Sequence, residues 1–255
     1  MGALRLTGCW AAAWSIWRMC GAISMPSGDS SPHRPPLSVL DWEHQYRIVS
    51  SEFPPINFFE RLVEPGLMEE LFYIEGLTND RLRDEAGAIT LVDPEDRVSG
   101  PGSSPLMAAF THIGVESRFS DGSFGVYYAA KSLKTAIEET KFHRARFLAY
   151  TQEDPGEIDL RVYVGEVAKP LHDIRGREYR HLHDPDDWRP SQAFGLDMWA
   201  ARSWGIVYRS VRDAGGECIA ALRPPAVTIP RQGPHLSYVW DGTHIVRVYE
   251  KTLIQ

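Results

Sequence analysis

The sequence lacks the short motifs that mark several large enzyme classes. No candidate strand is followed by Gly-x-Gly-x-x-Gly, and Gly-x-x-x-x-Gly-Lys-Ser/Thr does not occur. Neither the Rossmann nor the P-loop mode of nucleotide binding is therefore expected. Gly-x-Ser-x-Gly is also absent, which leaves no nucleophile elbow for a hydrolase serine.

Cysteine, positive charge and long apolar runs are scarce too. The three cysteines, Cys9, Cys20 and Cys218, have no metal-ligand spacing, which favours a reducing cytoplasm over a disulfide framework. A net charge of −7 argues against a broad nucleic-acid surface. No uninterrupted apolar run is long enough to span a bilayer. We therefore expect a cytoplasmic protein that contacts neither membrane nor nucleic acid directly.

The first 36 residues differ in composition from the rest of the 255-residue chain. Residues 1–24 are rich in Trp, Ala and Cys, and either a signal peptide or a start of translation at Met25 would explain them. Arg18 interrupts the apolar stretch, which favours the start at Met25. We expect residues 1–36 to be a disordered or non-native extension and residues 37–255 to form one domain.

What is present is 43% hydrophobic and reads as many short strands with few helices, which predicts an α+β fold. Strands are expected at 46–50, 89–92, 124–130, 158–167, 206–209, 218–222, 236–240 and 244–250. Helices are expected at 106–111, 133–149 and 192–204, the last with Phe194, Met198, Trp199 and Ala201 inward. The segment at about 51–115 reads as an insertion that forms a lid or a partner surface.

The segment 117–149 organises the chain. A strand that carries Tyr127 and Tyr128 leads to Ser132, which can cap the helix that follows. Glu139 and His143 are four residues apart in that helix, so they share one face. Spacing alone favours an ordinary salt-bridged helix face over a site of chemistry.

Ordered blocks of residues change that interpretation. The first is Tyr46-Arg47-Ile48-Val49; the second comprises Arg118, Tyr128, Ala130, Ser132, Ala136 and Glu139; the third is 205–212, which contains Ser210, followed by Gly215-Gly216-Glu217-Cys218. Together they resemble the RES-domain family, which is named after its arginine, glutamate and serine. The sequence departs from many members around Arg118, because it lacks their glycine pair before this arginine and their Trp-Asn after it.

The resemblance implies an ADP-ribosyltransferase-like split β-sheet core with a helical insertion, and NAD as the substrate. It implies a toxin of a toxin–antitoxin system that cleaves NAD at the nicotinamide–ribose bond, with an Xre-type antitoxin as partner. A mono-ADP-ribosyltransferase that modifies a protein acceptor is the alternative, and a non-catalytic interaction module is the second.

The same resemblance implies roles for six residues. Arg47 and Arg118 would bind the pyrophosphate or ribose side of NAD, and Tyr128 would line the nicotinamide–ribose pocket. Glu139 would stabilise the oxocarbenium-like ribose left when nicotinamide departs. Ser210 would hydrogen-bond within the cleft, and His143 would position Glu139 or touch the acceptor. That acceptor could be water, a protein, or phosphate held by His143, Arg144 and Arg146.

The polar segment 172–188 carries histidines beside aspartates: His172, His181 and His183 with Asp184, Asp186 and Asp187. Histidines two residues apart can share a metal ion. The same composition is typical of an ordinary acidic loop, and we expect no metal site here.

Overall fold

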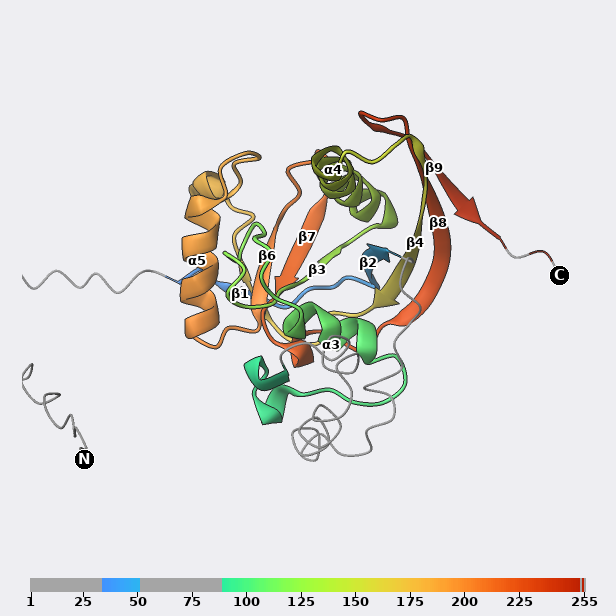
Figure 1. Cartoon of the computed structure of the whole chain (residues 1–255). Coiled ribbons are helices and arrows are strands. Elements are labelled where there is room, and N and C mark those ends of the chain that lie inside the picture. Colours follow the sequence, from blue (N-terminus) through green and yellow to red (C-terminus); the bar gives the residue numbers. More distant parts are fainter. Residues whose placement is uncertain (1–33, 51–88, 253, 255) are drawn as a thin grey trace, which may run out of the picture. The chain divides into compact units, whose positions relative to one another are not determined.

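The computed structural model describes residues 34–50, 89–252 and 254, and Pro35–Gln255 form one unit (Figure 1). Its strands are β1 (Leu37–Ser38), β2 (Gln45–Ser50), β3 (Tyr127–Ala130), β4 (Gly156–Gly165), β5 (Leu171–Asp173), β6 (Gly205–Arg209), β7 (Glu217–Ala221), β8 (Arg231–Trp240) and β9 (Ile245–Lys251). Its helices are α3 (Ser104–Thr111), α4 (Leu133–Thr151) and α5 (Arg189–Ala200), with 3-10 helices at Ile89–Leu91, Pro94–Asp96, Arg177–Leu182 and Pro224–Ala226. The expected N-terminal extension and the first part of the expected insertion, 51–88, lie outside the described residues.

Within the described residues the strands form one nine-stranded sheet in the order β1-β5-β6-β7-β3-β2-β4-β8-β9. β5 and β6 are parallel, and the other neighbours are antiparallel. β2 pairs with β4 along its whole length but meets β3 only where Tyr46 faces Ala130. The sheet therefore opens between β2 and β3. This confirms the α+β class, and the closer likeness to ADP-ribosyltransferases stays a prediction.

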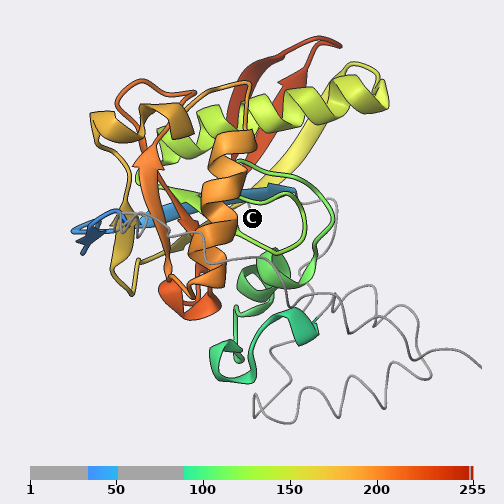
Figure 2. The same cartoon turned by 90° about the vertical axis from the view of Figure 1, so that its left-hand side faces the viewer.

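The alternation of side chains along β3 divides the core between the two faces of the sheet. Tyr127 and Ala129 belong to one apolar cluster, to which α3 contributes the fully buried Leu106 and Met107. Tyr128 and Ala130 face the opposite cluster, to which α4 and α5 contribute Ala136 and Met198. Figures 1 and 2 show α4 above the strands and α3 below them.

Several local predictions are confirmed. Ser132 caps α4, because its Oγ accepts a hydrogen bond of 3.1 Å from the Thr135 amide. The expected helix at 106–111 is α3, and the expected strand pairs form β6–β7 and β8–β9. These signals are local in sequence, which explains why they could be read without the fold.

Two local predictions are wrong. The apolar run 89–92 forms a 3-10 turn, closed by the hydrogen bond from the Val92 amide to the Ile89 carbonyl, in place of a strand. Trp199 is 40% exposed and stacks on Phe124 at 5.0 Å between ring centroids, so it does not point inward. The helix expected at 192–204 is α5, which ends at Ala200, so Ala201 lies beyond it and is not on its buried face. That face runs through Ser191, Gly195 and Met198.

Candidate active site

The third block of the family signature meets the second at one short contact. The Ser210 hydroxyl donates a hydrogen bond of 2.6 Å to Oε1 of Glu139, across 71 residues of sequence. Glu139 lies in α4, and Ser210 begins the turn between β6 and β7. The packing of α4 against the turn between β6 and β7 therefore places these two residues together.

The hydrogen bonds around Ser210 fix the direction of its proton. Its Oγ accepts from the Arg212 amide at 3.1 Å and from the Asp213 amide at 2.9 Å. A hydroxyl has two lone pairs and one proton, so with both lone pairs engaged the proton points to Glu139. Ser210 is thus placed to orient a carboxylate and not to act as a nucleophile. Within the described residues, Oε2 of Glu139 accepts no hydrogen bond from the protein.

Tyr128 and α5 hold the loop that carries Arg118. The Tyr128 hydroxyl accepts a hydrogen bond of 3.0 Å from the Phe119 amide and lies 2.9 Å from the Ser117 hydroxyl. Burial raises the pKa of Tyr128 to about 12, so the phenol stays neutral at physiological pH. Gly195 of α5 lets the loop approach closely, because a Cβ there would collide with the Phe119 carbonyl.

Arg118 is buried, with 7% of its surface exposed, yet its described partners carry no charge. Its guanidinium donates to the backbone carbonyls of Leu182, at 3.5 Å, and Asp184, at 2.9 Å. Carbonyl oxygens satisfy the N–H groups but do not neutralise the cation. Burial and Arg212 lower the pKa of His143, and the positive charge of Arg118 adds to that shift. Burial raises the pKa of Tyr208, and the charge of Arg118 opposes that rise. Among the described residues no carboxylate hydrogen-bonds Arg118. The exposed Asp184 carboxylate lies near enough that the charge of Arg118 lowers its pKa, after the amides of Asp187 and Asp186 that bond it.

Arg212 was not assigned a role from the sequence, but its guanidinium lies in the same neighbourhood. It donates a hydrogen bond of 2.7 Å to the Pro185 carbonyl and stacks on the Phe142 ring at 3.4 Å. Burial lowers the pKa of Arg212, and the nearby charge of Glu139 opposes this shift. The available signal was its place two residues after Ser210 in a charged turn.

His143 lies one helical turn after Glu139 and is exposed to solvent, with its ring centroid 5.9 Å from that of Trp188. Protein atoms crowd the imidazole and disfavour its charged form, and neighbouring cations act in the same direction. Together they lower the pKa of His143 to about 4. The cations are Arg212, Arg118, Arg146 and Arg144. His143 is therefore neutral at physiological pH and able to accept a hydrogen bond.

Arg47 is placed apart from this group. It lies at the opening between β2 and β3, where it donates a hydrogen bond of 3.1 Å to the Tyr128 carbonyl. Its guanidinium sits 4.6 Å from the centroid of the Tyr127 ring, on the opposite face of β3 from the Tyr128 side chain. The structure therefore brings Arg118, Tyr128, Glu139, Ser210 and His143 into one neighbourhood, and it gives Arg47 contacts at the sheet opening.

Residues 182–185 of the histidine-rich segment bond to this neighbourhood through Arg118, Arg209 and Arg212, and we call them the strap. His183 Nε2 accepts from the Arg209 amide at 3.2 Å, and its Nδ1 lies 2.9 Å from the Tyr179 carbonyl. His172 contacts the Ser203 hydroxyl instead. Across residues 34–50 and 89–252, no group of three or more His, Cys, Asp or Glu is arranged to hold a metal ion.

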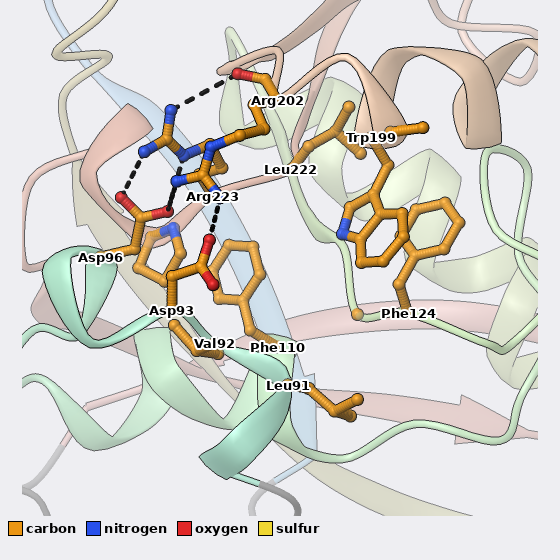
Figure 3. Close-up of a pocket in the computed structure, with 13 residues that line it drawn as sticks. Leu91, Val92, Asp93, Asp96, Phe110, Phe124, Trp199, Arg202, Leu222 and Arg223 are labelled. Atoms are coloured by element: carbon orange, nitrogen blue, oxygen red, sulfur yellow. Dashed lines mark hydrogen bonds and ion pairs between the residues drawn. The ribbon is translucent and has the colours of Figure 1, made fainter.

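A hollow of about 280 Å³ lies at the other end of β7, lined among others by Phe110, Trp199, Leu222 and Arg223 (Figure 3). Its polar wall is an ion-paired cluster in which Arg223 bonds Asp96 through two hydrogen bonds of 2.6 and 2.7 Å.

The described part of the chain also contains no helix long and apolar enough to cross a membrane.

Comparison with known proteins places the chain in a family. The model of the RES domain matches residues 94–241. The uncharacterized protein y4oC of Sinorhizobium fredii is 31% identical over 209 residues, which cover 80% of this chain and 86% of that protein. A crystal structure of the M. tuberculosis MbcT–MbcA toxin–antitoxin complex aligns with 49% of this chain and 72% of that one, at 19% identity and a TM-score of 0.35. The extent of the family match and of the likeness to y4oC shows that this chain belongs to the RES-domain family.

Proposed function

We propose that this protein is the toxin of a toxin–antitoxin pair and that it breaks the nicotinamide–ribose bond of NAD. The family resemblance supplies the substrate and the reaction class. The single observation that carries the proposal to these residues is the Glu139 carboxylate, which Ser210 orients, in a neighbourhood that also contains Arg118 and Arg212. The described hydrogen-bond partners of these two arginines are neutral carbonyls.

The charges suit the two parts of this substrate. The diphosphate of NAD is anionic, and guanidinium groups bind phosphate oxygens through paired, charge-assisted hydrogen bonds. A ligand phosphate could replace the carbonyls of Asp184 and Pro185 as the partner of Arg118 and Arg212. The net charge of −7 makes a local excess of cations stand out, since it cannot reflect a generally basic surface.

The bond that breaks joins ribose C1′ to the pyridinium nitrogen. The electron pair of this bond leaves with nicotinamide, which becomes neutral, and positive charge develops on C1′ and the ring oxygen. The Glu139 carboxylate stabilises that charge, and its second oxygen can accept a hydrogen bond from a ribose hydroxyl. An acceptor oxygen then bonds to C1′ and loses its proton to solvent or to a neutral base such as His143.

The test is release of nicotinamide from NAD by the purified protein, followed by chromatography. Glu139→Gln keeps size and removes charge, so turnover should fall by about three orders of magnitude. Glu138→Gln is the matched control, because Glu138 is the neighbouring carboxylate and pairs with Lys141 at 3.2 Å. Full turnover by the Glu139 variant would exclude the mechanism.

The partner and the acceptor need separate experiments. Induction of the protein should arrest bacterial growth, and co-expression of an Xre-type antitoxin should relieve the arrest; harmless induction of active protein would contradict the toxin role. Labelled NAD incubated with cell lysate distinguishes breakdown from modification. Label only in small molecules supports NAD breakdown, and label on a discrete protein band supports mono-ADP-ribosyl transfer.

A further inference from the structure

The turn between β6 and β7 is docked on α4 at two places. Ser210 meets Glu139, and Asp213 Oδ2 accepts a hydrogen bond of 2.8 Å from the Thr135 hydroxyl. Thr135 and Glu139 are four residues apart, so they lie on one side of the helix, one turn from each other. Ser210 and Asp213 are three residues apart in the turn. The two contacts therefore join the same two elements side by side. We call them the first rung, Ser210–Glu139, and the second rung, Asp213–Thr135.

Asp213 belongs to both rungs. Its carboxylate holds Thr135, and its amide donates one of the two hydrogen bonds that direct the Ser210 hydroxyl. Thr135 is 2% exposed, and 11% of the Asp213 side chain is exposed, so this rung is shielded from solvent. Lys134 also contacts Asp213 at 2.7 Å, but 76% of its side chain is exposed, so solvent weakens that pair.

Gly216 shows how closely the turn is pressed against the helix. A Cβ at this position would lie 2.7 Å from Cγ2 and 2.8 Å from Oγ1 of Thr135. The Gly216 amide also donates to the Asp213 carbonyl at 2.9 Å, and its own carbonyl accepts from the Ser210 amide at 2.9 Å. The turn thus closes on itself between its two rungs, which couples the position of Asp213 to that of Ser210.

We infer that Asp213 is a positioning residue. Its hydrogen bond with Thr135 fixes the position of Ser210, and Ser210 in turn fixes the orientation of the Glu139 carboxylate. This inference rests on the proposed function for its kinetic consequence, but the mechanical coupling does not depend on it. Asp213 does not touch the reacting atoms. Its effect is transmitted through the turn, where a displacement of about 1 Å can cost on the order of a hundredfold in rate.

The kinetic test uses Asp213→Ala and Thr135→Val, each of which removes the second rung. We expect kcat for nicotinamide release to fall about tenfold or more, with KM within about twofold, because the carboxylate is misdirected while the arginines still bind substrate. Thr135→Ser keeps the hydroxyl and should restore most of kcat. Thr151→Val is the matched control, since Thr151 lies on the same helix and, among the described residues, its hydroxyl bonds backbone carbonyls of its own last turns.

A second test needs no activity. Free energies of unfolding in urea are measured for Thr135→Val, Ser210→Ala and the double variant, without NAD. We use the word clamp for the two rungs acting together. If they do, the double variant loses less unfolding free energy than the sum of the losses in the single variants, with a coupling equivalent to about a fivefold change in the unfolding equilibrium.

The outcomes separate the two proposals. Wild-type kcat in Asp213→Ala or Thr135→Val, or strictly additive losses in the cycle, would overturn the clamp. If the wild-type protein releases no nicotinamide but the cycle shows coupling, the proposed function fails and the clamp stands. A fall in kcat in Thr135→Val that Thr135→Ser reverses supports both.

Discussion

Two pairs of arginines lie at opposite ends of β7 and are satisfied in different ways. Arg223, after the end of β7, bonds Asp96 through two nitrogens, and Arg202 pairs with Asp93 (Figure 3). Arg202 also pairs with Glu95. Arg118 and Arg212, near the turn before β7, donate to backbone carbonyls. Carboxylates cancel the charge of an arginine, whereas carbonyls only satisfy its N–H groups. We propose that the first pair stabilises the fold and that the second keeps its charge available to a ligand.

The surroundings of each pair agree with this division. Asp96 is 4% exposed, and the Arg223 guanidinium also stacks on the Trp204 ring at 3.9 Å. Such a buried, bidentate pair is destabilising to break, because the remaining charge has no partner. Around Arg212 the described neighbours are an aromatic face and a carbonyl, together with the charges of Asp186 and of Glu139, which already bonds Ser210.

Breaking the structural pair should have the largest effect on stability. Arg223→Met leaves Asp96 buried with only a long contact to Arg202, so the free energy of unfolding should fall by roughly 3 kcal/mol. Nicotinamide release per folded molecule should be unchanged. Arg189→Met is the control, since 87% of that side chain is exposed in its pair with Asp187, and it should shift stability by less than about 0.5 kcal/mol. A loss of activity without a loss of stability in Arg223→Met would reverse the roles of the two pairs.

Removing a cation from the second pair should mainly weaken the interaction of the protein with its substrate. Arg118→Met deletes charge-assisted hydrogen bonds to the diphosphate, so kcat/KM for nicotinamide release should fall about 30-fold, or about 2 kcal/mol. Its stability should fall less than that of Arg223→Met, because only neutral carbonyls lose their partner. Steady-state kinetics and urea unfolding on the same preparations measure both quantities. Equal stability losses in the two variants, with KM unchanged in Arg118→Met, would erase the distinction.

Tyr128 links the fold to the second pair, and its hydroxyl can be removed alone. Tyr128→Phe leaves the buried Phe119 amide without its acceptor, which should cost about 1 to 2 kcal/mol of stability. The Arg118 loop should loosen, so KM should rise severalfold while kcat changes little. Tyr249→Phe on β9 is the matched control, because that residue is 48% exposed. Identical stabilities for the two variants would show that the Tyr128 hydroxyl does not hold the loop.

The sequence allowed the β3–α4 unit to be predicted because its signals are local, whereas Glu139 was assigned a role only through the resemblance of separated blocks. The Ser132 cap, the burial of β3 and the four-residue spacing in α4 all act within one or two turns of chain. The partners of Arg118 lie 64 and 66 residues away and are backbone atoms, which carry no side-chain signature. The role of the strap 182–185 could therefore not be read from composition, which suggested only an acidic loop.

The error at Trp199 has a similar cause, and Arg47 has a contact that the sequence did not reveal. Trp199 was expected inward because it is apolar, but Gly195 sets the buried face of α5 by admitting the Phe119 backbone, and Trp199 is turned off that face. Arg47 was assigned to substrate by resemblance, and in the structure it occupies the opening of the sheet with the Tyr128 carbonyl. Its role toward NAD stays a prediction. Burial preferences indicate which residues are apolar, and tertiary contacts decide which of them are covered.

The smallest expected effect concerns His143 and the charge that the second arginine pair keeps. The folded pKa of about 4 lies below the ordinary value of 6.5, mainly through burial and then through Arg212, Arg118, Arg146 and Arg144. Between these two pH values the unfolded chain binds a proton that the folded chain does not. Stability from this group is therefore present above about pH 6.5 and is lost as the pH falls towards 4.

The test compares wild type with His143→Gln in urea at a series of pH values from 7.5 to 4. The stability of wild type relative to the variant should decrease steadily below about pH 6.5 and level off near 4, and part of that decrease should vanish when Arg212→Met is added to both proteins, since one cation is then gone. Nicotinamide release by wild type should show no inflection between pH 6 and 8, because His143 is neutral throughout that range. An identical decrease in the Arg212→Met background would mean that the charge of this arginine is compensated after all, and the contrast between the two pairs would lose its electrostatic basis.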